Sequence, residues 1–405
     1  MGRPGGEALS TTFTPRRIPP LADFDRAREE IRRHGLDAVV CSLAHNVHYF
    51  SGIDSPPLWH FPGYATVIVP AQGEPALICS ILTLNSSAEM DPWISDVYLV
   101  YRGDSILYLA EELLESERYI RELRDALVPT ASPTPYDAVA KALTDRGLQN
   151  GKIGFDEPGM AGRIPLDGFL PFDAVDVLRS IRMIKTEPEI EKMRKAAVVN
   201  EEAALEAVRL IPLLPTIEDV VARYRSAIAL RGGEAKYLLT GSPHHTGTFQ
   251  HQFKDYPAAP GDFLMVDALG TWQHYHGDFG RTVSWGAPEA KVRRRFDAMR
   301  RGFEAGYETA RPGVPFAEIS EAVRETARRE GFPEFVATTP HSVGLEHTDN
   351  PRTPNQVARA NMTMNIDIVY MEAGFGALHL EDTFLIRESG NELLTSGKTE
   401  LIVLE

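Results

Sequence analysis

The spacing of apolar residues changes along the chain, and it predicts two regions of different construction. From about Leu21 to Asp176, helical and strand-like patterns alternate. Helix-prone stretches fall at 23–33, 108–127 and 136–147, and short strand-like runs fall at 35–42, 64–70, 76–80 and 152–156. This alternation predicts an α/β layer domain. The region contains neither a Gly-x-Gly-x-x-Gly nor a Walker pattern, so no phosphate-binding loop is expected there.

A junction is expected near residues 178–186. Thr186-Glu-Pro-Glu begins a long helix with a hydroxyl cap, a proline in the first turn and two acids at the positive end of the helix. A chain of 405 residues also exceeds the size of one ordinary core. Residues 1–20 are rich in Gly, Pro, Thr and Arg and predict a loosely held arm. The expected organisation is this arm, a first domain at 21–178 and a second at 179–405.

The second half of the chain repeats itself weakly. Residues 216–225 resemble residues 315–324 in their pattern, and Ser242-Pro-His244 resembles Thr339-Pro-His341. A similar acidic segment follows in each copy. An internal repeat of this kind predicts two α+β halves packed about a pseudo-twofold axis.

The acidic segment at the end of each copy carries two carboxylates. An apolar, β-prone run ends at Asp267, and a second run begins at Asp278 after a turn. The later copy has the same form, with Asp367 and Glu381. If each segment folds as a hairpin, the two carboxylates within it lie opposite each other, with Cβ atoms about 5 Å apart. Four carboxylates that close repel strongly, so a pair of divalent cations roughly 3.5–4 Å apart is expected among them.

Composition narrows the classes of partner and compartment. A formal charge of −15 argues against nucleic acid and against an anionic membrane surface as partners. The two cysteines, Cys41 and Cys79, have no metal-binding or redox spacing, which favours a reducing cytoplasm. The sequence shows no apolar run of eighteen residues and no signal-peptide stretch near its start, so neither a membrane span nor export is expected.

In its two acidic segments and in the motifs around them, the chain resembles the pita-bread superfamily of prolidases, aminopeptidase P, methionine aminopeptidases and creatinase. It is most similar to the two-domain, Xaa-Pro peptidase-like branch. The shared motifs are Lys185-Thr-Glu-Pro-Glu, Asp278-x-x-Arg-Thr, His341-Ser-Val-Gly-Leu-Glu and Leu380-Glu-Asp-Thr. The resemblance implies an α+β fold, with an N-terminal creatinase-like α/β domain before a C-terminal pita-bread domain that has an internal pseudo-twofold duplication. It also implies a homodimer.

The resemblance further implies the ligands and the chemistry of a dinuclear metal site. The implied ligands are Asp267, Asp278, His341, Asp367 and Glu381, with Asp278 and Glu381 bridging the two ions. Carboxylates with one imidazole suit Mn²⁺, Zn²⁺, Co²⁺ or Fe²⁺, and no thiolate is offered. A hydroxide between the ions would attack an amide carbonyl. The expected function is a dinuclear metallohydrolase that cleaves a C–N bond, with an Xaa-Pro dipeptide as the default substrate.

Other residues are candidates for proton transfer and for substrate contact. His251 and His347 are the expected catalytic imidazoles, which would stabilise an oxyanion or protonate the leaving nitrogen. His244, His379 and Trp59 are further candidates for substrate contact. Arg281 is expected to brace its hairpin through carboxylates.

Four positions depart from the pattern of the family and keep the substrate open. Asp367 stands where the family has Glu, His379 where the peptidases have Arg, and Ala337 where aminopeptidase P has His. His347 follows His341 one residue sooner than the family's second His. One alternative is the same fold acting on a small zwitterion, by creatinase-like or ectoine hydrolase-like hydrolysis or as a lyase on a sulfonium compound. Another is a non-catalytic binding protein.

Overall fold

The structure is a computed structural model that divides the chain into two compact units, Met1–Leu178 and Arg179–Glu405. It describes residues 16–61, 63–80, 82–83, 90–103, 110–113, 115–241, 255–333, 338–353 and 355–405. Residues 1–15 of the expected arm therefore lie outside the described residues. In the residues that are described, no helix combines the length and the apolar character that crossing a membrane requires.

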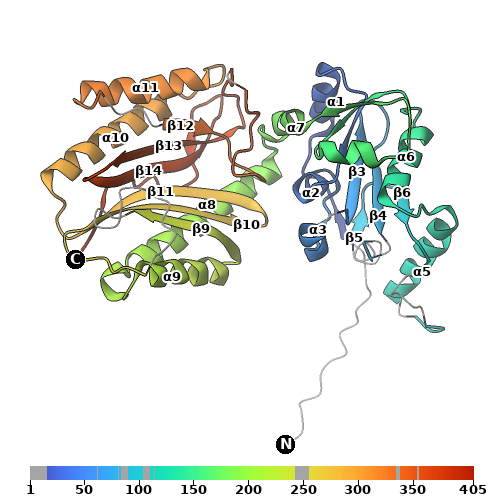
Figure 1. Cartoon of the computed structure of the whole chain (residues 1–405), viewed down its shortest axis with the longest axis horizontal. Helices are drawn as coiled ribbons and strands as arrows, with labels where there is room; N and C mark the ends of the chain where they lie inside the picture. The colour runs from blue at the N-terminus through green and yellow to red at the C-terminus, as the bar shows by residue number, and fades with distance from the viewer. Residues whose placement is uncertain are drawn as a thin grey trace, which may run out of the picture. The chain divides into compact units, whose positions relative to one another are not determined.

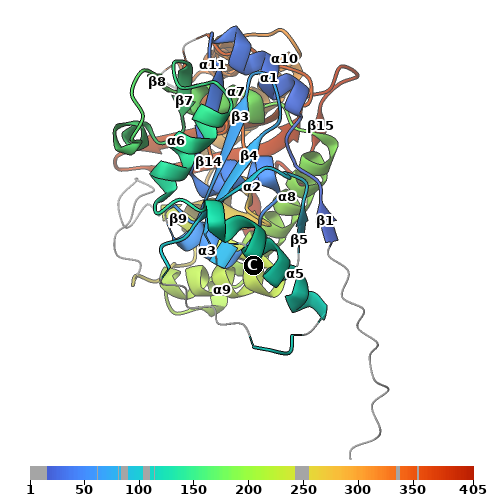
Figure 2. The ribbon, with the colours of Figure 1, turned by 90° about the vertical axis from the view of Figure 1, so that its right-hand side faces the viewer.

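The first unit is built on a six-stranded mixed sheet with helices packed against it. The strand order is β6 (Val97–Val100), β4 (Ala76–Ser80), β3 (Ala65–Pro70), β2 (Ala38–Cys41), β7 (Lys152–Phe155), β8 (Leu170–Asp173). The helices are α1 (Phe24–Arg33), α2 (Ala44–Ser51), α3 (Pro56–His60), α5 (Glu115–Leu127) and α6 (Pro135–Asp145), and β1 (Arg16–Ile18) pairs with β5 (Met90–Pro92). Figures 1 and 2 show α2 and α6 on opposite sides of the sheet. The α/β layer prediction is confirmed.

One helix of this unit is shorter than its pattern predicted. The expected helix at 108–127 begins at Glu115, and residues 110–113 are not helical. Residues 104–109 and 114 lie outside the described part. Nothing in the structure explains the later start.

The second unit contains two copies of one helix–helix–three-strand arrangement. The first copy is α8 (Glu187–Val208), α9 (Ile217–Leu230), β9 (Gly233–Gly241), β10 (Phe263–Trp272) and β11 (Tyr275–Trp285). The second is α10 (Ala290–Thr309), α11 (Phe316–Arg329), β12 (Thr338–His341), β13 (Thr363–Glu372) and β14 (Gly376–Leu385). The sheet order β12-β13-β14-β11-β10-β9 joins the copies at β14 and β11, with β15 (Glu392–Leu393) and β16 (Ile402–Leu404) alongside. The predicted duplication is confirmed.

The strands of this sheet keep their apolar and acidic residues on different faces. On β10, Val266 and Ala268 belong to the core that also contains Tyr224 of α9, and Asp267 between them faces the other way. On β13, Ile366 and Ile368 belong to the core under α10 and α11. Figure 1 shows the strands between α10 and α11 at the top and α9 at the bottom. Because side chains alternate along a strand, the carboxylates gather on the face away from the helices.

The first acidic hairpin has a register that differs from the one expected. Gln273 and His274 form a two-residue turn with positive φ values of 46° and 69°, and Trp272 lies opposite Tyr275. This tight turn places Asp267 opposite Gly280, whereas Asp278 lies opposite Leu269. The expectation that Asp267 lies opposite Asp278 is therefore wrong by two positions. The two carboxylates still share a face, as diagonal neighbours.

The second hairpin has the register that the sequence predicted. Three residues connect Glu372 to Gly376, and Gly374 within them has a φ of 85°. The register is the same at Asn365–Thr383 and at Ile368–Leu380, which brings Asp367 level with Glu381. Glu381 in turn lies opposite Gly280 on β11. One row across the four strands therefore reads Asp267, Gly280, Glu381, Asp367.

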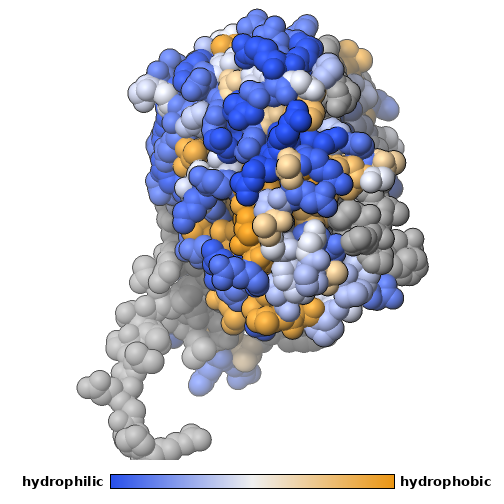
Figure 3. Space-filling model, turned by 90° about the vertical axis from the view of Figure 1, so that its left-hand side faces the viewer, coloured by the Kyte–Doolittle hydropathy of each residue, from blue (hydrophilic) through white to orange (hydrophobic). Residues whose placement is uncertain are grey.

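The outer surface of the second unit is uneven in polarity. The face in Figure 3 is mostly hydrophilic in its upper part, and hydrophobic residues gather in its lower half. Among the described residues of this unit, the most exposed large apolar side chains are Leu230 at the end of α9 and Leu213, with exposed fractions of 82% and 77%. A single exposed apolar side chain needs no functional explanation.

Candidate metal centre

The first group of possible ligands consists of Asp278, His341 and His347, whose ligand atoms all lie within 4.8 Å of one another. The Nε2 atom of His347 lies 2.9 Å from Asp278 Oδ2. The Nε2 atom of His341 lies 3.9 Å from the same oxygen and 3.5 Å from Glu381 Oε1. Asp278 and His341 are buried, whereas 43% of the His347 side chain is exposed. His347 is therefore the member of this group that a substrate can reach.

The second group consists of Asp267, His379 and Glu381, also with ligand atoms within 4.8 Å of one another. The Nε2 atom of His379 lies 2.9 Å from Asp367 Oδ1 and 3.5 Å from Glu381 Oε2. Asn365 Nδ2 donates a hydrogen bond of 2.9 Å to Glu381 Oε1. Glu381 belongs to this second group and also contacts His341 of the first group, at 3.5 Å.

The electrostatics of the cluster show an excess of negative charge. Burial, together with the charges of the other carboxylates, raises the pKa of Asp267 and of Asp278 well above the usual value. Burial opposes ionisation of Glu381 as well, but His341 and His379 hold its pKa at about 2. Burial acts to lower the pKa of His379, and the carboxylates of Asp367, Asp267 and Glu381 outweigh it and raise that pKa to about 10. Bound cations would offset this excess of negative charge.

The residues present fit divalent metal ions. Asp278 Oδ1 and Asp267 Oδ1 are buried and have no hydrogen-bond partner among the described residues. A buried carboxylate oxygen without a donor is costly unless a cation binds it. The available ligand atoms are carboxylate oxygens and imidazole nitrogens, which suit first-row divalent ions.

A buried network of charges supports the loop that carries His347. Arg182 Nε and Lys185 Nζ donate to the two oxygens of Asp349, at 3.0 Å and 2.9 Å. Arg179 Nη2 donates to Glu346 Oε1 at 2.8 Å, and Arg182 also contacts Glu346. Burial disfavours the Asp349 carboxylate, but Arg182 and Lys185 keep its pKa well below the usual range. These bonds tie the residues on both sides of His347 to the start of the unit.

Not every residue singled out from the sequence can be placed in this cluster. His244 and His251 fall in residues 242–254, and Ala337 falls in 334–337, so all three lie outside the described residues. Trp59 lies on α3 of the first unit, where its Nε1 donates to Asp54 Oδ1 at 3.0 Å. The proposed roles of His244, His251 and Trp59 therefore stay predictions.

Two polar residues of the site were not singled out from the sequence. Asn365 stands two positions before Asp367, on the same face of β13. Tyr237 on β9 lies opposite Leu269, and its ring centroid is 6.3 Å from that of His347. Burial and the carboxylates of Asp267 and Asp278 raise the pKa of Tyr237. Because side chains alternate between the two faces of a strand, the sequence of β13 could have identified Asn365 from its spacing to Asp367. Only the pairing of β9 with β10 identifies Tyr237.

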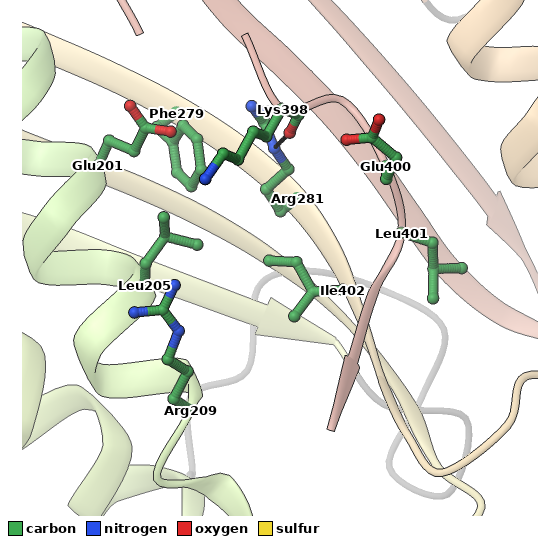
Figure 4. Close-up of a pocket in the computed structure, with 9 residues that line it drawn as sticks. All are labelled: Glu201, Leu205, Arg209, Phe279, Arg281, Lys398, Glu400, Leu401 and Ile402. Carbon is green, nitrogen blue, oxygen red and sulfur yellow. Dashed lines mark hydrogen bonds between the residues drawn. The ribbon is translucent and has the colours of Figure 1, made fainter. Parts of the chain in front are cut away.

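The opposite face of β11 is structural and also lines a pocket. Arg281 donates to Asp382 Oδ1 and to the backbone oxygen of Glu381, both at 2.8 Å, so it joins β11 to β14 of the second hairpin. The expectation that it braces its own hairpin through the carboxylates of that hairpin is wrong. Phe279 and Arg281 face a pocket of about 190 Å³ whose other side is the segment 398–402 (Figure 4). Since Phe279 and Arg281 alternate with Asp278 and Gly280 along the strand, this pocket is separate from the metal centre.

Fold and site together define a class of protein. It is a two-domain α+β protein whose duplicated C-terminal unit gathers carboxylates and imidazoles for metal binding. The model of metallopeptidase family M24 matches residues 191–388, and that of the creatinase/prolidase N-terminal domain matches residues 24–196. The two models together match residues 24–388, in the order of the two-domain creatinase/prolidase form, which confirms the resemblance.

Similar proteins of known name agree with these matches. The chain is 32% identical over 244 residues to the probable dipeptidase PepE of Mycobacterium bovis, a match that covers 58% of this chain and 65% of that protein. The match to this relative therefore spans less than two thirds of its length. The chain is 28% identical over 315 residues to an Xaa-Pro dipeptidase of Pyrococcus horikoshii, covering 75% of this chain and 88% of that one.

The structural comparison concerns the fold. The crystal structure of dipeptidase PepE from Mycobacterium ulcerans superimposes with a TM-score of 0.72 at 24% identity, covering 94% of this chain and 96% of that chain. At this identity the likeness shows the fold alone, because one fold supports many activities. The predicted fold, a creatinase-like domain followed by a pita-bread domain, is confirmed.

Proposed function

We propose that the protein is a metal-dependent hydrolase that cleaves a C–N amide bond, with Xaa-Pro dipeptides as its substrates. The observation that supports this most directly is the convergence of Asp267, Asp278, His341 and Glu381 on one buried face of the sheet. Those residues come from four different strands, so their meeting is not a local accident of sequence. The match to the model of a peptidase family and the similarity to dipeptidases support the choice of substrate.

Two divalent ions are proposed to bind at this face. Asp267, Asp278, His341, Asp367 and Glu381 would hold them, with Asp278 and Glu381 shared between the two. When bound, such ions lower the pKa of a water molecule and polarise an amide carbonyl. Asn365 holds one oxygen of Glu381 through its amide, which orients that carboxylate within the site.

His347 is proposed to move the proton during catalysis. Its Nε2 contacts Asp278 Oδ2 at 2.9 Å, while 43% of its side chain is exposed. An imidazole there can accept a proton and pass it to the leaving nitrogen of the amide. The network of Arg182, Lys185 and Asp349 keeps the His347 loop in place, which limits the entropy lost when the substrate binds.

The direct test combines metal content with a substrate screen. The metal-free protein is supplied with Mn²⁺, Zn²⁺, Co²⁺ or Fe²⁺ and assayed against Gly-Pro and Ala-Pro, and in parallel against creatine, ectoine and a sulfonium zwitterion. Release of proline with about two ions bound per chain is expected. Activity on a zwitterion alone would replace the dipeptide with that substrate. Full activity in a metal-free chain would end the proposal.

A homodimer is proposed as the assembly, following the family resemblance. Light scattering coupled to size-exclusion chromatography measures this directly, since one chain has a mass of 44.9 kDa. A mass near twice that value is expected at micromolar concentration. A mass that stays at the value of one chain would remove the dimer from the proposal.

A further inference from the structure

The side chain of His379 lies within the carboxylate cluster, and the family resemblance of the chain does not explain a histidine at this place. Its side chain is 1% exposed, and its Nε2 lies 2.9 Å from Asp367 Oδ1 and 3.5 Å from Glu381 Oε2. With Asp267 and Glu381 it forms one of the two groups of ligand atoms that lie within 4.8 Å of one another. Two ligand atoms that each lie about 2.1 Å from one ion are separated by roughly 3–4 Å. The position of Nε2 therefore matches that of a ligand atom.

The space that the imidazole fills depends on a glycine. Gly280 lies between Asp267 and Glu381 in the row across the sheet. A Cβ atom at Gly280 would come within 2.4–2.7 Å of three atoms of the His379 ring. Any other residue would exclude the ring from this place. The absent side chain thus gives His379 its access to both carboxylates.

The other nitrogen of the ring determines which atom faces the carboxylates. Nδ1 of His379 lies 3.3 Å from the backbone oxygen of Val266. Because a carbonyl oxygen can only accept a hydrogen bond, Nδ1 must carry the proton that it donates. A proton on Nδ1 leaves Nε2 free to bind a metal ion. Metal-binding histidines generally donate their second N–H to a carbonyl or carboxylate in this way.

Asp367 provides an independent reason for an added ligand. The family has Glu at this position, and the side chain of Asp is shorter. Asp367 belongs to neither of the two groups whose ligand atoms lie within 4.8 Å of one another. His379 belongs to one of them and contacts Asp367 directly. The imidazole therefore reaches the place that the shorter carboxylate does not reach alone.

We propose that His379 is a metal ligand, which binds through Nε2 the ion held by Asp267 and Glu381. This inference rests on the proposed metal centre and adds a ligand to it. With His341 at the other ion, each ion then has one imidazole. Nitrogen ligands favour Zn²⁺ and Fe²⁺, whereas Mn²⁺ is favoured by oxygen ligands. The centre is therefore selective for Zn²⁺ over Mn²⁺ at the ion that Asp267 holds.

The competing interpretation makes His379 a protonated partner of Asp367 that touches no metal. In that case its removal would change the stability of the metal-free chain and leave metal selectivity alone. His379→Asn separates the two roles, because the amide of asparagine can still donate to the Val266 oxygen but offers no atom at the position of Nε2. His48→Asn is the matched control, since His48 is also buried and its Nδ1 contacts a backbone oxygen, that of Ile53, at 3.0 Å.

The experiment measures Zn²⁺ and Mn²⁺ affinity by competition with a chromophoric chelator in the full chain. Losing a partner that only orients a ligand costs about 10–100-fold in affinity, so losing a ligand should cost at least the upper end. We expect His379→Asn to weaken Zn²⁺ at one of two sites by about 100-fold or more, and Mn²⁺ by much less. His48→Asn should leave both affinities unchanged. Unchanged Zn²⁺ affinity in His379→Asn would overturn the inference.

A measurement on the unchanged protein guards against a variant that fails to fold. Crystals loaded with Zn²⁺ locate the ions by anomalous scattering, with Nε2 of His379 expected about 2.0–2.1 Å from one of them. An ion more than about 3 Å from Nε2 would make His379 a partner of Asp367 only, and the inference would fail while the proposed hydrolase stands. A chain that binds no divalent ion at all would overturn both.

Discussion

Replacement of Gly280 by alanine tests the packing on which the site depends. The new Cβ would lie 2.4 Å from Cε1, 2.5 Å from Nδ1 and 2.7 Å from Nε2 of His379. The ring cannot retreat without losing its contacts with the Val266 oxygen and with Asp367. Overpacking of this kind costs about 1–3 kcal/mol, and loss of a hydrogen bond to a charged group adds about 1.5–3 kcal/mol. The expected loss of stability is therefore about 3–5 kcal/mol.

The assay is thermal unfolding of the chelated protein, so that metal binding adds nothing to the stability. For a unit the size of Arg179–Glu405, a change of 1 kcal/mol shifts the melting temperature by about 2–4 °C. Gly280→Ala should lower the transition of this unit by about 10 °C. Gly159→Ala is the matched control, because no atom lies within 4 Å of a Cβ at that position.

A double variant identifies the cause of the loss. In a His379→Ala background the ring is absent, so adding Gly280→Ala should cost much less than it does alone. Equal costs in the two backgrounds would refute the reasoning, because the clash would then not be with His379. A melting temperature within about 2 °C of the unchanged protein would refute it as well.

Three further predictions address the ligands, the loop and the protons. Asp278→Asn should lower metal occupancy and activity together, as measured by elemental analysis and proline release, because the residue is proposed to be shared by both ions; retention of both would contradict that role. Asp349→Asn should destabilise the second unit by about 3–5 kcal/mol in urea unfolding, since it leaves Lys185 buried without its carboxylate and takes from Arg182 one of its two, and adding Lys185→Met should recover part of the loss. In the chelated protein, folding raises the pKa values of Asp278 and His379. The resulting stability is fully present at pH values below the pKa values of the unfolded chain, and it is lost as the pH rises through the pKa values of the folded chain. The melting temperature should therefore fall from pH 5 to pH 9 and recover with Zn²⁺; a rise with pH in the chelated protein would show that the sign is wrong.

The sequence alone was enough to identify the architecture and to predict the kinds of ligand. The alternation of apolar and acidic residues around Asp267 and Asp367 determines which face each side chain takes, since that alternation is a local property of a strand. The repeated order of helices and strands was likewise visible in the duplicated pattern. The second hairpin also had its expected register, with Asp367 level with Glu381.

Only the tertiary structure decided which residues stand beside one another. The two-residue turn at Gln273 and His274 moved Asp278 to face Leu269, and the pairing of β11 with β14 brought Gly280 beside Glu381. Neither the conformation of a short turn nor the pairing of strands a hundred residues apart can be read from periodicity. The place that His379 takes in the cluster follows from both, because the space for its ring exists only where Gly280 meets the second hairpin.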